Sequence, residues 1–511
     1  MTEFYQANDG RFSVPVMRAR AFLHLCQHKA IYLGKDELIV GERGPAPKVV
    51  PTFPKLTCHS VENLRILNSR PKTWYRVDGE CIRLYEEKII PYWRGRSMRD
   101  RMFAELPPEW RDAYDAGIFT EFMEQRAPGH TVLDDKIYTK GMLDFKEDIA
   151  DAIARLDFLN DPEAYEKRET LKSFDISCDA LIVFAERHAA LARELAAKET
   201  RPQRQAELLK IAETCSHVPA QAPCDFHEAL QYYWFCHLAV ITELNGWDSF
   251  NPDTVVEEQL RQGNSLEDAR AGGCSGCVEV GAFGKEAYIL TGYFNLVKVL
   301  ELTLHNGLDP RTGKQFGLKT GAPDCFKTYA DLFAAFRQQL HHFIEIKIRG
   351  SRLIERMYAD HMPAPFLSVL IDDCMAKGRD YNAGGARYNN TFIQMAGLGS
   401  ITDCLSAMKQ FCFDGSSLSA GEAGERAGVR WGFRFPNSFP SSTRTSPTTN
   451  CSASASSTRP TSTATTTTTP TRSCSMSSTL VSRKSMAGPT RAAAAIAWRC
   501  CPPPATSISA A

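Results

Sequence analysis

The acidic residues of this chain are confined to its first part, which limits where a packed structure can form. Glu425 is the last of the 60 Asp and Glu residues in a chain of 511. The remainder consists mainly of Ser, Thr, Ala, Pro and Arg and has no helical or strand period. A segment this poor in large apolar side chains cannot offset the entropy of ordering. We therefore expect the folded part within residues 1–415 and no packing in residues 416–511.

Two interpretations of the low-complexity tail, residues 416–511, remain open. Its runs of Ser, Thr and Pro are typical of a disordered linker or a mucin-like stalk. Alternatively, the tail is the translation of a GC-rich gene in a shifted reading frame. A frameshift would explain why acidic residues and hydrophobic patterning are lost together.

Residues 1–415 alternate helical periodicity with short apolar runs, which favours a mixed α/β fold. Thr328 followed by Asp331 predicts a capping box at the start of a helix. The apolar run Phe366–Ile371, bounded by Pro365 and Asp372, is typical of a buried strand. Further helices are predicted from residue 144, with Ile149, Ile153, Leu156 and Leu159 on one face, and over 171–197, 203–214, 229–244 and 294–305.

Composition excludes several classes of protein. The chain is 43% hydrophobic and 23% charged, as in an ordinary globular protein, and its formal net charge is zero. This balance gives no reason to expect a nucleic-acid or membrane partner. The first residues do not resemble a secretion signal, so we expect a cytoplasmic protein whose 17 cysteines stay reduced.

A glycine-rich stretch, Ala271–Tyr293, carries the residues best suited to chemistry. Cys277 and Glu279 are two residues apart, so in an extended backbone their side chains face the same space. The surrounding glycines remove side-chain bulk and allow a tight loop to approach a substrate. A thiol and a carboxyl group on one side would suit an elimination reaction.

This stretch, S-G-C-V-E-V-G-A-F-G-K-E-A-Y-I-L-T-G-Y, resembles the cysteine loop of the glycyl radical enzymes, in the G-C-V-E form of their dehydratases and lyases. Three more segments carry the resemblance, which extends from about Gly10 to about Gly415: E-F-M-E-Q-R-A-P-G-H-T (Glu121–Thr131), T-E-L-N-G-W-D-S-F (Thr242–Phe250) and G-G-A-R-Y-N (Gly384–Asn389).

The resemblance implies a pyruvate formate-lyase-like α/β barrel of ten strands surrounded by helices, with the cysteine loop inside. It implies a lyase that removes water from a small hydroxylated substrate, with trans-4-hydroxy-L-proline the expected one. A radical S-adenosylmethionine enzyme would install the glycyl radical under anaerobic conditions, no bound cofactor or metal would be needed, and the family tends to form homodimers.

The resemblance also assigns roles to five residues. Cys277 would form a thiyl radical that takes a hydrogen atom from the substrate, and Glu279 would handle the proton of the departing hydroxyl. His130, Asp248 and Tyr293 would line the substrate pocket, with Asp248 binding a substrate ammonium or hydroxyl group.

The chain departs from the family pattern in two places. After about residue 250 a long family stretch that supplies barrel strands is missing, so we expect an incomplete barrel with exposed strand edges. No R-V-x-G-Y type loop, which carries the radical glycine in the family, occurs in the sequence, so we expect the C-terminal radical domain to be absent. An inactive remnant is therefore the alternative to a dehydratase.

Competing chemistries have weaker support. Cys274 and Cys277 form C-x-x-C, but a zinc site would require a second ligand pair, and no thioredoxin-like context is evident. The doublets His341–His342 and Asp372–Asp373 lack metal-site spacing, so we expect no metal. Formate C-acetyltransferase chemistry is disfavoured because Gly276, not a second cysteine, precedes Cys277. Glycerol or diol dehydration and choline or isethionate cleavage remain alternatives within the family.

Overall fold

The computed structural model describes residues 1–49, 54–71, 74–119, 134–244, 265, 267–268, 273–274, 280–414 and 497–498. The N-terminal half contributes α1 (Thr2–Asn8), α2 (Val14–His28), α3 (Val61–Ser69), α4 (Gly79–Leu84), α5 (Ile90–Trp93), α6 (Met98–Glu105), α7 (Pro108–Asp115), α8 (Lys136–Thr139), α9 (Met142–Ala154), α10 (Ala164–Lys198), α11 (Pro202–His217) and α12 (Phe226–Leu244). The remainder contributes β1 (Gly273–Cys274), β2 (Val280–Gly281), β3 (Glu286–Asn295), α15 (Leu296–Leu304), α16 (Tyr329–His361), α17 (Pro365–Val369), α18 (Cys374–Lys377), β4 (Tyr388–Ala396), α19 (Leu398–Met408) and β5 (Ala497–Trp498).

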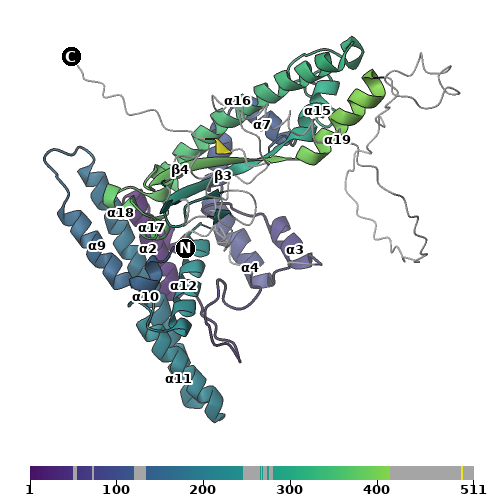
Figure 1. Ribbon diagram of the computed structural model, residues 1–511. Coiled ribbons are helices and arrows are strands. Elements are labelled where there is room, and N and C mark those ends of the chain that lie inside the picture. The colour runs from purple at the N-terminus through teal and green to yellow at the C-terminus, as the bar shows by residue number, and fades with distance from the viewer. Residues whose placement is uncertain are drawn as a thin grey trace, which may run out of the picture.

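The strands β3 and β4 lie between two hydrophobic cores (Figure 1). On one side α2, α9, α10, α11, α12 and α17 form a helical bundle, to which β3 contributes Ala287 and Ile289. On the other side α6, α7, α15, α16 and α19 pack around Phe294 of β3 and Ile393 of β4. β3 pairs with β4 in parallel, with a register irregularity between Leu290 and Tyr293. A parallel pair covered by helices on both faces is the arrangement that an α/β fold requires.

The predicted helices are largely confirmed, because their signals are local. At the start of α16, Thr328 Oγ1 accepts a hydrogen bond from the Asp331 amide at 3.2 Å, and Asp331 Oδ2 accepts one from the Thr328 amide at 2.8 Å. This is the predicted capping box. The helix predicted from residue 144 ends at Ala154, so its proposed apolar face is wrong beyond that point, and Leu159 is 95% exposed.

The predicted strand at Phe366–Ile371 is wrong, because this run begins with the short helix α17. Pro365 occupies its first turn, where a missing amide hydrogen costs nothing. The carboxylate of Glu243 accepts hydrogen bonds from the Phe366 and Leu367 amides, each at 3.0 Å. A carboxylate supplied from α12 therefore caps the helix start, and this tertiary contact cannot be read from an apolar run.

Within the tail, residues 416–511, the structure describes only Ala497 and Trp498. Ala497 and Trp498 form β5, which pairs antiparallel with Thr391 and Phe392 of β4 (Figure 1). A strand edge presents unpaired amide and carbonyl groups, and these accept any extended segment that reaches them. These two residues are described only through their pairing with the edge of β4.

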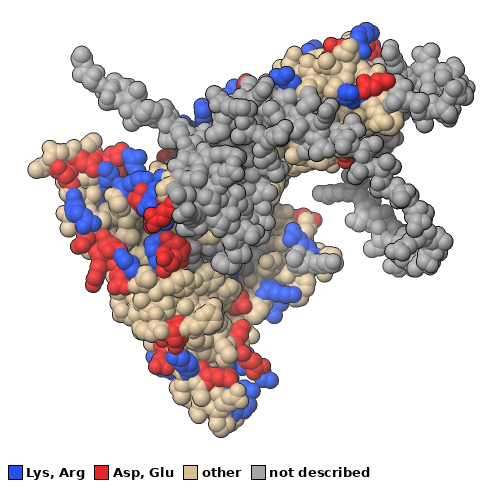
Figure 2. All heavy atoms as spheres, in the orientation of Figure 1, with Lys and Arg blue, Asp and Glu red and all other residues tan. Residues whose placement is uncertain are grey.

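Surface charge is mixed where the structure describes it. On the visible face of the helical bundle, acidic and basic side chains alternate over short distances (Figure 2). Exposed pairs such as Lys198–Glu194 at 2.5 Å belong to this pattern. Among the described helices, none combines the length and apolar character required to cross a bilayer.

A lysine in the second core predicts how stability depends on pH. Lys347 of α16 is fully buried, and its Nζ donates to the Thr291 carbonyl of β3 at 2.5 Å. Burial lowers the pKa of Lys347 from 10.5 to about 7, although Glu355 opposes this shift. The folded state then binds fewer protons than the unfolded state between about pH 7 and 10.5, so the free energy of unfolding rises with pH.

Because of this lysine, we expect the free energy of unfolding to rise by about 2 kcal/mol from pH 7 to pH 9. Urea unfolding of the wild type and of Lys347→Met at both pH values measures the effect. The variant should lose most of the pH dependence in this range, since Met keeps the apolar bulk without a titrating group. Equal slopes for the two proteins would contradict the prediction.

Candidate active site

The cysteine loop lies between two short paired strands. β1 and β2 are antiparallel, with Gly273 opposite Gly281 and Cys274 opposite Val280. The five residues that join these strands, 275–279, include Cys277 and Glu279 and lie outside the described residues. The ends of the loop are therefore placed by backbone pairing, at a spacing suited to a short hairpin connection.

A buried carboxylate fixes the segment that follows the hairpin. Glu286, the first residue of β3, is fully buried and accepts a hydrogen bond from the Ala282 amide at 2.9 Å. Its other carboxylate oxygen accepts from the side-chain amide of Asn390 on β4. Residues 282–286 are thereby tied to both central strands, because a buried carboxylate requires such partners.

The turn at Gly284 is held by residues from two distant segments. Gly284 has φ +68°, and a Cβ there would lie 2.4 Å from Asp134 Oδ2, so only glycine fits. The Gly284 carbonyl accepts from the Asp372 amide at 2.7 Å and from Lys136 Nζ at 3.2 Å. Lys136 also pairs with the Asp372 carboxylate and donates to the Leu370 carbonyl at 3.0 Å. Burial raises the pKa of Asp134, although Lys136 opposes this shift.

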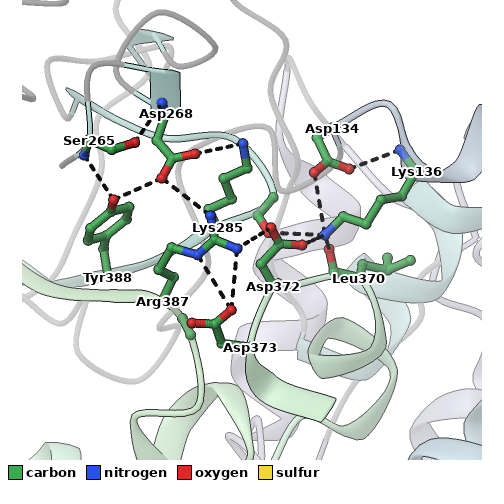
Figure 3. Close-up of polar contacts among 12 residues, drawn as sticks. Asp134, Lys136, Ser265, Asp268, Lys285, Leu370, Asp372, Asp373, Arg387 and Tyr388 are labelled. Carbon is green, nitrogen blue, oxygen red and sulfur yellow. Dashed lines mark hydrogen bonds and ion pairs between the residues drawn. The ribbon is translucent and has the colours of Figure 1, made fainter. Parts of the chain in front are cut away.

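A second set of contacts joins the two flanks of the hairpin (Figure 3). Asp268, which precedes the hairpin, pairs with Lys285, which follows it, at 2.7 Å. Asp268 also accepts from the Tyr388 hydroxyl at 2.8 Å and lies 3.4 Å from Arg387 Nη1. Burial disfavours the charged form of Asp268, but hydrogen bonds from Lys285, Tyr388 and Ser265 outweigh burial and lower its pKa to about 2.

These contacts form one connected group, which we call the anchor network. Arg387 bridges the contacts around Asp268 and those around Asp372. Besides its contact with Asp268, Arg387 Nη2 lies 3.0 Å from Asp372 Oδ2 and 3.3 Å from Asp373 Oδ1 (Figure 3). Such a network of charge-assisted bonds can hold a loop in one geometry. Its members are Asp134, Lys136, Asp268, Lys285, Asp372, Asp373, Arg387 and Tyr388.

Sequence reasoning missed most of this network. The doublet Asp372–Asp373 lacks metal-site spacing, and nothing in its sequence indicates that both carboxylates pair with Arg387. The sequence feature that could have indicated a role for Arg387 and Tyr388 is their position in G-G-A-R-Y-N, a segment that resembles the family. Nothing in the sequence indicated that Asp268 and Lys285 would meet across the hairpin.

Of the five predicted site residues, only Tyr293 is described. It lies in β3, partly buried, opposite Gln394 of β4. Cys277, Glu279, His130 and Asp248 lie outside the described residues, so their roles stay predictions.

The segment 120–133, which contains His130, has both of its flanks placed along β3. Before it, Phe119 bridges Phe294, next to Tyr293, and the Asn295 amide donates to the Ile118 carbonyl at 2.9 Å. After it, Asp134 lies beside Gly284, two residues before β3 begins.

One group among the described residues could hold a metal ion. Potential ligand atoms of His217, Cys224 and Glu228 lie within 4.8 Å of one another. Glu228 Oε2 already interacts with His217 Nδ1 at 3.0 Å and accepts from the Cys224 amide at 2.8 Å. These bonds satisfy the buried carboxylate without an ion.

Comparison with known proteins gives consistent results. The sequence matches the family described as pyruvate formate lyase-like over residues 1–252 and 247–432. It is 38% identical to trans-4-hydroxy-L-proline dehydratase from Clostridioides difficile, over 81% of this chain and 69% of that protein. It is 24% identical to isethionate sulfite-lyase from Desulfovibrio desulfuricans, over 82% of this chain and 67% of that protein.

Solved structures show the same relationship. The crystal structure of hydroxyproline dehydratase from Clostridioides difficile, with trans-4-hydroxy-L-proline bound, matches with a TM-score of 0.76 and 37% identity, covering 81% of this chain and 68% of that chain. The glycerol-bound B12-independent glycerol dehydratase from Clostridium butyricum matches with a TM-score of 0.75 at 23% identity, covering 83% and 70%. The expected fold class, an α/β barrel surrounded by helices, is confirmed by these neighbours. The chain belongs to the pyruvate formate lyase-like family of glycyl radical enzymes.

Proposed function

We propose that this protein is a glycyl radical dehydratase, a carbon–oxygen lyase, whose substrate is trans-4-hydroxy-L-proline. The observation that carries the proposal is the 38% identity to trans-4-hydroxy-L-proline dehydratase over 81% of this chain. The anchored hairpin around residues 275–279 supports it, because a reactive loop must be held in a fixed geometry to act on a small molecule.

In the proposed reaction Cys277 transfers hydrogen atoms and Glu279 transfers protons. A glycyl radical, when present, supplies the oxidation that turns the thiol into a thiyl radical. The Cys277 sulfur takes a hydrogen atom from the carbon next to the ring nitrogen. Glu279 gives a proton to the departing hydroxyl, which leaves as water, and recovers a proton from the substrate. The thiol then returns its hydrogen atom to the product radical.

The substrate would be held by Asp248, His130 and Tyr293. The Asp248 carboxylate would bind the ring ammonium, which is the natural partner of a buried acid. Support for grouping His130 with Tyr293 comes from the two flanks of segment 120–133: Phe119 bridges Phe294, next to Tyr293, and Asp134 lies beside Gly284, just before the strand that carries Tyr293. No metal or soluble cofactor takes part in the proposed reaction.

The proposal includes the organisation of the chain. Residues 1–415 would form the barrel domain without a family stretch after about residue 250, and residues 416–511 would be a low-complexity tail. Two findings support the missing stretch. The family matches meet at residues 247–252, and the alignment with the Clostridioides relative spans 541 residues, whereas it covers only 81% of the 511 residues here. A radical S-adenosylmethionine enzyme would activate the protein, and two copies would form a dimer.

Substrate binding provides a test that does not require the radical. Isothermal titration of the full chain should give saturable binding of trans-4-hydroxy-L-proline, with at least about tenfold weaker binding of L-proline, because the hydroxyl partners would be left unsatisfied. Glycerol and isethionate should not compete. Turnover is then measured anaerobically with the activating enzyme, alone and with a separately produced polypeptide that carries a glycine-radical loop. Binding of glycerol or isethionate in preference would overturn the substrate and leave the family assignment intact.

A further inference from the structure

A cavity of about 250 Å³ lies between the N-terminal helices and the end of α16. It is separate in sequence from the hairpin and shares no residue with the anchor network. Its apolar wall includes Tyr5, Met17, Trp93 and Met98, all buried, and Tyr92 lies beside them. The cavity is slightly smaller than the range of about 300–1,000 Å³ typical of drug-sized ligands, so an occupant would be small.

The polar lining of this cavity is mainly basic. Lys55, Arg96, Arg101 and His361 line it, and Asp9 is its one acidic residue. Asp9 is already paired, since its Oδ2 lies 3.3 Å from Arg96 Nη1. In the part of the chain that the structure describes, no carboxylate lies within ion-pair distance of Lys55, Arg101 or His361. Among the described residues, Lys55, Arg101 and His361 are therefore basic groups of this cavity that have no carboxylate partner.

Lys55 is held firmly at this cavity. Its carbonyl accepts from the Met98 amide at 2.7 Å, which ties the backbone of Lys55 to the first turn of α6. Its Nζ donates to the Tyr5 hydroxyl at 3.0 Å and lies 4.9 Å from the centre of the Tyr5 ring. An ammonium with a hydroxyl and an aromatic face as its neighbours keeps unused donor capacity for an anionic oxygen.

We propose that this cavity binds a small organic carboxylate, with its carboxylate at Lys55 and Arg101 and its apolar or aromatic body against Trp93 and Met98. An anionic group would pair with the basic residues that lack a carboxylate partner, and an apolar body would contact the apolar lining. The ligand contacts α1, α5 and α6 together, so its binding stabilises the docking of α1. Burial, together with Arg18 and Arg101, lowers the pKa of Lys55 well below 10.5, and a bound carboxylate would restore the charged form.

The test uses three probes on the full chain: benzoate, neutral benzyl alcohol and inorganic phosphate. Isothermal titration and thermal unfolding should show saturable binding and stabilisation by benzoate that exceed those by the other two. Lys55→Met should weaken benzoate binding at least about tenfold, because it removes a charge-assisted hydrogen bond. Without ligand this variant should be at least as stable as the wild type, since it removes an amino group that no carboxylate partners.

Two further variants keep the test decisive. Arg101→Gln changes an exposed side chain and should also weaken benzoate binding without affecting folding. Lys198→Met removes a surface lysine that is paired with Glu194 and should leave binding unchanged. Unchanged benzoate affinity in both Lys55→Met and Arg101→Gln, or no benzoate binding up to the millimolar range, would overturn the proposal. Equal binding of phosphate and benzoate would replace the organic carboxylate with a simple oxyanion.

Discussion

Replacement of Cys277 by serine is expected to abolish turnover while leaving substrate affinity within about twofold of the wild type. A serine hydroxyl is nearly the size of the thiol, but its O–H bond is far stronger than an S–H bond, so a glycyl radical cannot take its hydrogen atom and no radical forms at this position. The loss should reach the detection limit of an anaerobic assay for the product. Binding, measured by titration, should survive because Cys277 acts on the substrate rather than holding it.

Cys274→Ser is the matched control for this experiment. Cys274 lies in β1, three residues before Cys277, and its backbone pairs with Val280. If Cys277 acts alone, Cys274→Ser should keep most of the activity. If the C-x-x-C pair worked as a dithiol, both variants should lose activity equally, and treatment with a reductant should change the activity of the wild type. Equal losses would therefore contradict the assignment of the radical chemistry to Cys277.

Gly385→Ala is expected to destabilise the protein by about 3 kcal/mol, at the upper end of the range for overpacked sites. A Cβ at Gly385 would lie 2.1 Å from the Arg379 carbonyl oxygen and 2.9 Å from the Asp380 carbonyl oxygen. Both atoms are backbone, so no side-chain rotation relieves the clash. The Gly385 amide also donates to the Asp380 carbonyl at 2.9 Å, which keeps the two segments close.

Gly385→Ala should disturb the anchor network as well as lower global stability. Gly385 stands two residues before Arg387, whose guanidinium joins Asp372 and Asp373 to Asp268. Chemical unfolding measures the loss of stability, and substrate titration measures the effect on the hairpin. Gly399→Ala in α19 is the control, because a Cβ there meets nothing within 4 Å and alanine favours helix. Equal stability of Gly385→Ala and Gly399→Ala would contradict the prediction.

What could be predicted from the sequence depended on how local the signal is. The start of α16 is encoded by Thr328 and Asp331, three residues apart, and both side chains make the expected bonds. The helix α17 instead depends on Glu243, more than a hundred residues earlier, so its apolar run gave a wrong assignment. The family segments located the candidate loop without revealing its supports. The pairing of Asp268 with Tyr388 spans 120 residues and leaves no trace in local spacing.

The same long separations bear on when the flanks of the cysteine loop become ordered during folding. Its flanks are joined by Asp268 and Lys285, but their partners Arg387 and Tyr388 arrive with β4, after α15, α16 and α17 have been made. Contacts between residues this far apart in sequence close large loops. Closing such loops is slow, so these contacts form late in most folding reactions. A nascent or partly folded chain therefore contains Cys277 before the residues that hold the flanks of the cysteine loop are in place. We therefore expect the flanks of the cysteine loop to be ordered only late in folding.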